Sequence, residues 1–424
     1  MTRMVSVRQT GRLLVGLLFL SLPWNRQLSF RVGAVSLSLA DVIIMIGGLL
    51  LMSAVMHGYT LRKPPQLAII GVGLLFFGGL LSLVAADDIT VALHTLASIS
   101  LKVLMVWLIV DSVEDMCHLK QLIFLYIIAA VVISIAAIGQ QVANMISGVS
   151  VQSVAGTLSA RNEMVYYVVP GFLMALTFMI AQGRSGLNAW LFGLAAAICF
   201  VAVVLSRGRV GVFIATILGL TVILIRLRQL GSGLRFMRII LSIGLLFGAL
   251  ALGSTFLTAE YVSHLVGRYS GASLVNELAD QRGSTFVRFL IIDGLLRAWL
   301  ESPLIGIGLG TFKDRSPEYI DMMLLGPNVA AVQPHNAYLG LLAEAGVFAL
   351  AGLLLLVTKG VGVLLQHRSG LYCEQGLRVA AGIGFVAVCL NLLTFDGLTR
   401  YVFWIFLALT LVVGHRLKGA NHEA

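Results

Sequence analysis

Long apolar runs follow one another along this chain, separated by short polar connections. About twelve of them are long and apolar enough to predict membrane-spanning helices, which need about 20 mostly apolar residues. The predicted spans are 12–24, 40–57, 67–86, 91–111, 121–147, 163–181, 189–206, 210–226, 239–257, 337–358, 379–395 and 401–415. The runs are continuous and lack the alternation of membrane β-barrel strands, so the pattern predicts an all-α polytopic membrane protein.

One sizeable polar segment interrupts this pattern, at residues 258–336. Loops of this length are usually functional or disordered. Here a helix is expected over residues 286–301, because Ser284 and Thr285 are suited to cap its start and Pro303 to stop it. The segment is therefore predicted to be a structured loop that contains amphipathic helices.

The predicted loop helix carries Asp293 and Arg297 at a spacing of i, i+4, which favours an ion pair. Its apolar side chains are suited to lying on a membrane surface. The residues expected on that apolar face are Phe286, Phe289, Leu290 and Leu296.

Three parts of the chain follow from this reading. Residues 1–257 are expected to hold transmembrane helices 1–9. Residues 258–336 form the long loop, and residues 337–424 hold transmembrane helices 10–12 and a short tail. No internal repeat is evident.

Composition agrees with the membrane assignment. Of 424 residues, 59% are hydrophobic and 11% charged, with a mean hydropathy of +0.98. A soluble domain is about half apolar and roughly a quarter charged. The composition therefore excludes a soluble enzyme, a disordered protein and a secreted disulfide scaffold. The first apolar run has no suitable cleavage site close behind it, so we expect an uncleaved first helix.

The net charge of +10 is unevenly distributed. With a cytoplasmic N-terminus, the short connections on that side hold fifteen Lys and Arg, against six on the other. Short loops obey the positive-inside rule, so both termini are predicted to be cytoplasmic and the long loop to lie on the far side.

Four arginines on the far side run against that rule: Arg161, Arg207, Arg209 and Arg288. One interpretation is that they are solvated or reach lipid headgroups. Another is that they act together, because the planar guanidinium fork suits phosphate and several forks together could hold a pyrophosphate.

His335 lies between Pro334 and Asn336, where the long loop enters the tenth predicted span. A single histidine in such a place can be structural. It can also accept a proton from a sugar hydroxyl, since its unperturbed pKa is near 6.5. Asn336 has two readings as well: it caps the helix, or it orients the imidazole or a sugar.

Lys102 lies inside the fourth predicted span, on one face with His94 and Ser98. A lysine deep in a span is a functional candidate. The alternative is a structural ion pair with a carboxylate such as Glu344 or Glu163.

Several chemical signatures are missing from the sequence. It contains no DxD pair for a metal–nucleotide site, no phosphate loop and no HExxH zinc motif. The glycines of residues 306–310 precede no βαβ unit, so they do not predict a dinucleotide site. We therefore expect no metal site and no cofactor.

Taken together, the far-side segments resemble the O-antigen ligase/polymerase superfamily of bacterial envelope glycosyltransferases. The resemblance covers roughly residues 150–350 and depends on the order of several short motifs. These are Gly156–Asn162 with Arg161, Ser206-Arg207-Gly208, Arg288 ahead of Trp299 and Pro303, Gly306/Gly308/Gly310 before Phe312, and the segment 334–346 with His335.

The resemblance implies a GT-C-like glycosyltransferase of the bacterial inner membrane with a periplasmic active site. It implies an undecaprenyl-pyrophosphate-linked glycan as donor and a sugar hydroxyl of lipid A–core as acceptor. The reaction would be inverting and metal-independent. Membrane lipid is the expected environment, nucleic acid is not a partner, and a monomer is expected.

Site roles follow from the same resemblance. His335 would be the general base, and Arg207 and Arg288 would stabilise the departing pyrophosphate. The expected substrate-binding residues are Arg161, Arg209, Asn336, Asn162, Tyr338 and Lys102.

Two other functions remain open at this stage. One is O-antigen polymerase on the same scaffold, in which the acceptor is another lipid-linked repeat. The other is a transporter or flippase for an anionic lipid, which would use the same arginines without chemistry. Transporters often show inverted repeats and interrupted spans in both halves, and neither is evident here.

Overall fold

The computed structural model describes residues 2–32, 35–147, 154–181, 187–227, 284–322, 330–365 and 372–419. Seven helices among them are long and apolar enough to cross a membrane. These are α2 (Leu39–Met56), α3 (Gln66–Ser82, continued by the short helix η2 at Leu83–Ala85), α4 (Ile89–Ser112), α5 (Met116–Ile146), α6 (Arg161–Ala181), α7 (Leu187–Leu205) and α14 (Ala337–Leu365). The chain is an all-α polytopic membrane protein, with one β-hairpin among the described residues.

Three further apolar helices are shorter in their described parts: α8 (Arg209–Leu227), α15 (Tyr372–Asn391) and α16 (Tyr401–Gly419). Each coincides with a predicted span. The first predicted span, 12–24, covers the second half of α1 (Thr2–Ser21) and the short helix η1 (Leu22–Trp24). The ninth predicted span, 239–257, lies outside the described residues, so the twelve-span layout stays a prediction.

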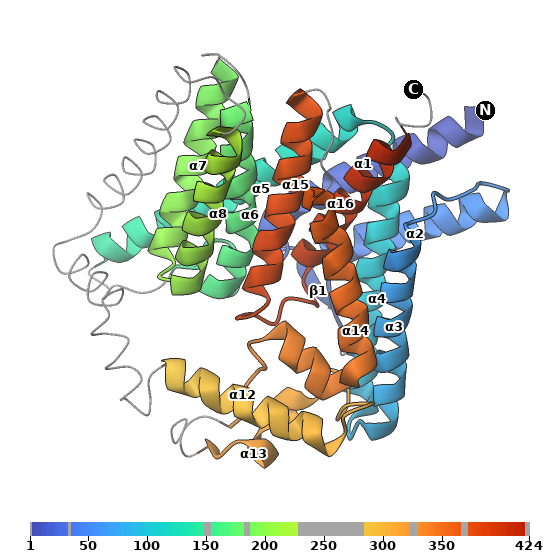
Figure 1. Ribbon diagram of the computed structural model, residues 1–424, viewed down its shortest axis with the longest axis vertical. Helices are drawn as coiled ribbons and strands as arrows, with labels where there is room; N and C mark the ends of the chain where they lie inside the picture. Colours follow the sequence, from blue (N-terminus) through green and yellow to red (C-terminus); the bar gives the residue numbers. More distant parts are fainter. Residues whose placement is uncertain are drawn as a thin grey trace.

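The bundle is organised around α6, whose residues are nearly all buried. It packs against α7, α15, α8 and α5, while α14 lies along α3. Figure 1 shows these helices upright and α5 crossing the bundle obliquely. At 31 residues, α5 is about 46 Å long, which exceeds the roughly 30 Å hydrocarbon core of a bilayer, so a tilt of this kind is expected.

Two helices of the predicted loop cover one end of the bundle. α12 (Ser284–Glu301) begins two residues before the predicted helix and ends where predicted, and α13 (Phe312–Tyr319) follows it. Figure 1 shows α12 lying across this end, which we call the α12 end, whereas the start of α1 and the end of α16 lie at the opposite end. The expected ion pair on α12 is present, with Arg297 Nη2 at 2.8 Å from Asp293 Oδ2.

The apolar face predicted for α12 differs from the observed one at Leu290. Phe289 (58% exposed) and Leu296 point outward, whereas Leu290 packs against a small core. The side chain of Phe286 lies outside the described residues. The helix is apolar on two sides, because a second row of residues faces α14 and α13. The buried members of that row are Ile291, Leu295 and Ala298.

A two-stranded antiparallel hairpin between α1 and α2 was not predicted. Strands β1 (Ser29–Val32) and β2 (Val35–Ser38) pair with Val32 opposite Val35. Just before it, Gln27 donates a hydrogen bond of 2.8 Å to the carbonyl of Thr157, ahead of α6. The hairpin therefore ties the first connection of the chain to the entrance of the central helix.

The glycine-rich segment after α12 docks against α14. Gly306, Gly308 and Gly310 all have positive φ, which side chains rarely tolerate. A Cβ at Gly306 would lie 2.3 Å from the backbone carbon of Glu344, so close approach also requires glycine. The Glu344 carboxylate accepts hydrogen bonds from the backbone N–H groups of Gly310 (2.9 Å) and Phe312 (3.1 Å). These glycines thus fix the loop to the start of α14.

Candidate functional site

Arg207 occupies a tight turn between two membrane helices. α7 ends at Leu205 and α8 begins at Arg209, so only three residues connect them. The Oγ of Ser206 accepts a hydrogen bond of 3.1 Å from the N–H of Gly208, which closes the turn. Arg207 adopts φ = 58°, in the left-handed region. Such a conformation costs a non-glycine residue about 1–2 kcal/mol.

Arg161 and Asn162 form the start of α6, beside the same turn. The next residue, Glu163, is buried and holds this start in place. Its carboxylate accepts hydrogen bonds from the backbone N–H (3.2 Å) and the hydroxyl of Ser159, and it lies 3.2 Å from Nη1 of Arg400. Arg161 is therefore presented by a helix terminus that an ion pair fixes.

The four arginines that conflict with the positive-inside rule come together. Arg288, Arg207 and Arg209 all exert an electrostatic repulsion on the Arg161 guanidinium. They come from the starts of α6 and α8, the α7–α8 connection and α12, and all four are half-buried. Positive charges that are gathered in half-buried positions repel one another strongly. We call the group of Arg161, Arg207, Arg209 and Arg288 the arginine recess. Such a cluster favours a bound polyanion.

His335 precedes α14 and lies close enough to Arg288 for the two side chains to interact electrostatically. Burial and the positive charge of Arg288 lower the pKa of His335 below its ordinary value of 6.5. The imidazole is therefore neutral at pH 7 and able to accept a proton.

His335 and Arg207 share an unusual backbone conformation. His335 has φ = 50°, and these two are the non-glycine residues with positive φ among those that the structure describes. Strained residues of this kind persist only where the surrounding structure holds them, and they cluster at functional sites. The sequence predicts both as site residues from their side chains alone.

Asn336 and Tyr338 have structural contacts at the start of α14. The Oδ1 of Asn336 accepts hydrogen bonds from the N–H groups of Tyr338 (3.1 Å) and Leu339 (3.0 Å), which is the geometry of a helix cap. The hydroxyl of Tyr338 donates to the carbonyl of Cys389, 3.0 Å away on α15. These contacts fix the first turn of α14, which follows His335 in the chain.

Lys102 has a different partner from the two that the sequence suggested. Its Nζ lies 3.3 Å from Oδ1 of Asp41 rather than against Glu344 or Glu163. Asp41 also completes the capping box of α2, in which Ser38 is the N-cap residue, and the Lys102 ammonium lies 4.7 Å from the ring centre of Tyr401. This buried group joins α2, α4 and α16. It adjoins the arginine recess through Arg400, whose charge acts on Lys102.

Sequence reasoning did not select Asp396, in the connection between α15 and α16. Its carboxylate interacts electrostatically with Arg400 and Glu344. Burial raises the pKa of Asp396, and Arg400 opposes that effect. The polar connection TFDGLTR, predicted on the same side as Arg161, is the feature of the sequence that could have pointed to Asp396. A single acidic residue in a short loop is not a specific indication of a site, however.

The described residues contain no cluster of three or more His, Cys, Asp or Glu side chains placed to hold a metal ion. The site contains the positive charges of the four arginines, the neutral imidazole of His335 and the carboxylate of Asp396. This set can bind a phosphate-rich group and move one proton.

Comparison with known families gives one match. A sequence model of the family described as O-antigen ligase matches residues 194–354. This segment includes Arg207, Arg209, Arg288 and His335, whereas Arg161 precedes it. No individual curated protein matches the chain. Residues 194–354 are therefore similar to the O-antigen ligase family, whose members are membrane glycosyltransferases.

Proposed function

We propose that this protein is an O-antigen ligase. It transfers a glycan from undecaprenyl pyrophosphate to a sugar hydroxyl of lipid A–core in lipopolysaccharide assembly. One observation supports this most directly: Arg161, Arg207, Arg209 and Arg288 gather in a recess next to a neutral His335. A pyrophosphate leaving group needs positive charge, which the arginines supply. A hydroxyl nucleophile needs a base, which His335 supplies.

The arginine recess binds the pyrophosphate of the donor. As the bond between the anomeric carbon and the pyrophosphate oxygen breaks, negative charge develops on that oxygen. Arg207 and Arg288 stabilise it, and each such donor is worth about 2.7–4 kcal/mol by analogy with oxyanion holes. Pyrophosphate leaves as a stable anion, so charge neutralisation matters more than a general acid.

His335 acts on the acceptor. Its neutral imidazole takes the proton from the sugar hydroxyl while the hydroxyl oxygen bonds to the anomeric carbon. A general base of this type contributes typically about 10²–10⁴-fold to a rate. Displacement is direct and inverts the anomeric centre, and neither a metal ion nor a nucleotide takes part.

The remaining parts of the proposal concern placement. The charge distribution supports a multi-pass protein of the bacterial inner membrane with both termini cytoplasmic. The α12 end is then periplasmic, where the lipid-linked donor and lipid A–core meet. Asn162, Asn336 and Tyr338 lie beside the recess as sugar-binding candidates. The protein acts as a monomer in membrane lipid. Lys102 supports the site through the buried group that joins α2, α4 and α16.

A product analysis tests the proposal. Purified protein is mixed with undecaprenyl-pyrophosphate glycan and lipid A–core, with EDTA present and no nucleotide. Glycan attached to lipid A–core is the expected product. Longer lipid-linked glycan without that product would identify a polymerase on the same scaffold. Movement of lipid-linked glycan across the bilayer without any new covalent product would identify a transporter.

A further inference from the structure

Arg400 lies in the connection between α15 and α16, outside the arginine recess. Its Nη1 lies 3.2 Å from Oε1 of Glu163, whose side chain is only 7% exposed. Both residues lie outside residues 194–354, the segment that is similar to the O-antigen ligase family. The proposed transfer mechanism gives neither of them a role, although their ion pair touches the helix that carries Arg161.

Glu163 divides its two carboxylate oxygens between Arg400 and the start of α6. Oε1 faces Arg400, whereas Oε2 accepts hydrogen bonds from the backbone N–H and the hydroxyl of Ser159. These bonds fix the first turn of α6, which begins at Arg161. Among the described residues, every charge that acts on Arg161 is positive. The charge of Glu163 is therefore balanced by Arg400 and not by the recess.

The same turn of α6 also supports the connection between α7 and α8. Val165 lies four residues after Arg161, so both residues are on one face of the helix. The α7–α8 region packs against that face. A Cβ at Gly208 would lie 3.2 Å from Cγ2 of Val165, and a Cβ at Gly211 would lie 2.2 Å from its Cγ1. A shift of this turn would therefore displace Arg161 together with the two recess arginines next to Gly208.

The α15–α16 connection holds Arg400 against the other face of α6. The backbone N–H of Arg400 donates to the carbonyl of Gly397 at 3.0 Å, and the hydroxyl of Tyr166 donates to the same carbonyl at 3.4 Å. The ring of Tyr166 also packs against Phe395, with 5.2 Å between the ring centres. Tyr166 lies three residues after Glu163, so the two share one face of α6. The connection thus presents Arg400 directly to Glu163.

We propose that Arg400 is a positioning residue of the transfer site and acts through Glu163. This inference rests on the proposed function. Arg400 neutralises the buried carboxylate, the carboxylate fixes the start of α6, and that start places three of the four recess arginines. A buried carboxylate is unfavourable without its cation. Loss of Arg400 therefore drives Glu163 out of its place and releases Ser159 and the first turn of α6.

Binding of undecaprenyl pyrophosphate to the full-length protein in nanodiscs tests this role. Arg400→Gln should lower the affinity by about tenfold or more, because the recess arginines are displaced. Arg400→Lys should bind like the wild type, because a point charge is enough to balance Glu163. The double variant Arg400→Gln/Glu163→Gln should recover the affinity. Its neutral amide needs no cation, and the amide oxygen still accepts hydrogen bonds from Ser159.

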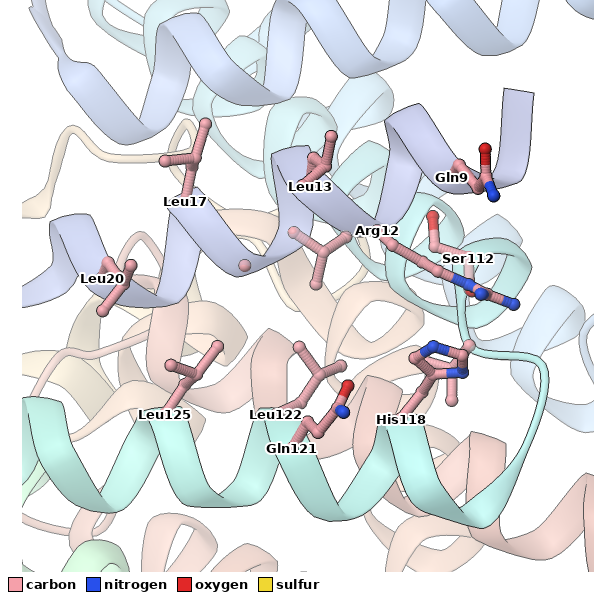
Figure 2. Close-up of a pocket in the computed structure, with 13 residues that line it drawn as sticks. Gln9, Arg12, Leu13, Leu17, Leu20, Ser112, His118, Gln121, Leu122 and Leu125 are labelled. Atoms are coloured by element: carbon pink, nitrogen blue, oxygen red, sulfur yellow. The ribbon is translucent and has the colours of Figure 1, made fainter. Parts of the chain in front are cut away.

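Arg12 provides the matched control, because it also pairs with a glutamate but lies at the opposite end of the bundle. Figure 2 shows Arg12 beside Ser112, at one end of the groove between α1 and α5. Its Nη2 contacts Glu114, and its Nε donates to the carbonyl of Ser112 at 3.4 Å. Arg12→Gln should leave the affinity for undecaprenyl pyrophosphate unchanged, whatever its effect on the melting temperature.

Hydrogen exchange at the backbone amides of residues 159–164 gives a second readout, which needs no donor. These amides should exchange faster in Arg400→Gln than in the wild type, and at the wild-type rate in Arg400→Lys and the double variant. A wild type that does not bind undecaprenyl pyrophosphate would contradict the proposed function, and the exchange rates would still decide whether Arg400 fixes α6.

Three results would overturn the role of Arg400. The first is wild-type affinity in a folded Arg400→Gln. The second is a double variant that binds no better than Arg400→Gln, since Arg400 would then not act through Glu163. The third is weak binding by Arg400→Lys, which would indicate a direct contact between the guanidinium and the donor. Weak binding by Arg400→Lys or by the double variant is decisive even if Arg400→Gln does not fold.

Discussion

At the scale of single residues, Arg207 and His335 combine reactive side chains with left-handed backbone. Each is placed by a short connection: Arg207 by the three-residue turn between α7 and α8, and His335 by the residues before the capped start of α14. Left-handed backbone is unfavourable for any residue with a Cβ. The strain indicates that the position of each side chain matters more than local stability.

Two substitutions at His335 distinguish the effect of its backbone conformation on stability from the effect of losing its side chain. His335→Gly relieves the strain at φ = 50°, whereas His335→Ala keeps it. We expect His335→Gly to be more stable than His335→Ala by about 1 kcal/mol, as for other left-handed positions. Thermal unfolding of the two variants in the same detergent measures the difference. Greater stability of His335→Ala would show that the left-handed backbone is not strained.

The arginine recess is expected to require guanidinium forks rather than charge alone. Arg207→Lys and Arg288→Lys keep one positive charge but lose the planar pair of donors. Each should lower the transfer rate by about tenfold or more, within the range lost when one preorganised donor is removed. Arg297→Lys, on the exposed side of α12, is the control and should transfer normally. Wild-type rates in both recess variants would remove these arginines from the mechanism.

The transfer rate should depend on the protonation of His335. Burial and Arg288 lower the pKa of His335 below 6.5, and the reactive form is the neutral one. Activity should therefore persist below pH 6.5 and fall only as the pH drops through that lowered pKa. Arg288→Gln removes a repelling charge, so the acid limb of kcat/KM should move to higher pH in its residual activity. An acid limb at or above 6.5 in the wild type would contradict this assignment.

At the scale of elements, the limits of the helices were easier to predict than the residues that they contact on neighbouring helices. The limits of α12 follow from local signals, because Ser284 and Pro303 lie at its ends. Its buried face was missed because both sides of the helix are apolar. The partner of Lys102 was missed for another reason. Asp41 lies 61 residues away, and only the packing of α2 against α4 brings the two together.

The Lys102–Asp41 pair should act mainly on stability. Lys102→Met leaves Asp41 buried without its cation, and breaking such a pair typically costs about 3–5 kcal/mol. We expect a clear fall in the melting temperature with a smaller effect on turnover by the protein that remains folded. The double variant Lys102→Met/Asp41→Asn should recover part of the stability. Lost turnover with unchanged stability would move Lys102 into the substrate site.

At the scale of the whole molecule, the connections on one side of the bundle build the recess. The start of α6, the α7–α8 turn, α12 and the start of α14 all contribute. Alternating apolar runs and the count of basic residues were enough to assign these connections to one side. They were not enough to select Asp396 or the Glu163–Arg400 pair, since these depend on contacts between α6 and the α15–α16 connection.

The central claim is that His335 removes the acceptor proton next to an arginine recess that holds the donor. The most direct test measures the single-turnover rate of glycan transfer by purified wild type and His335→Gln, with EDTA present, together with donor binding. We predict transfer by the wild type and a loss of about 10²-fold or more in the variant, as expected for a missing general base, with donor binding unchanged. Transfer by a folded His335→Gln at the wild-type rate would contradict the account.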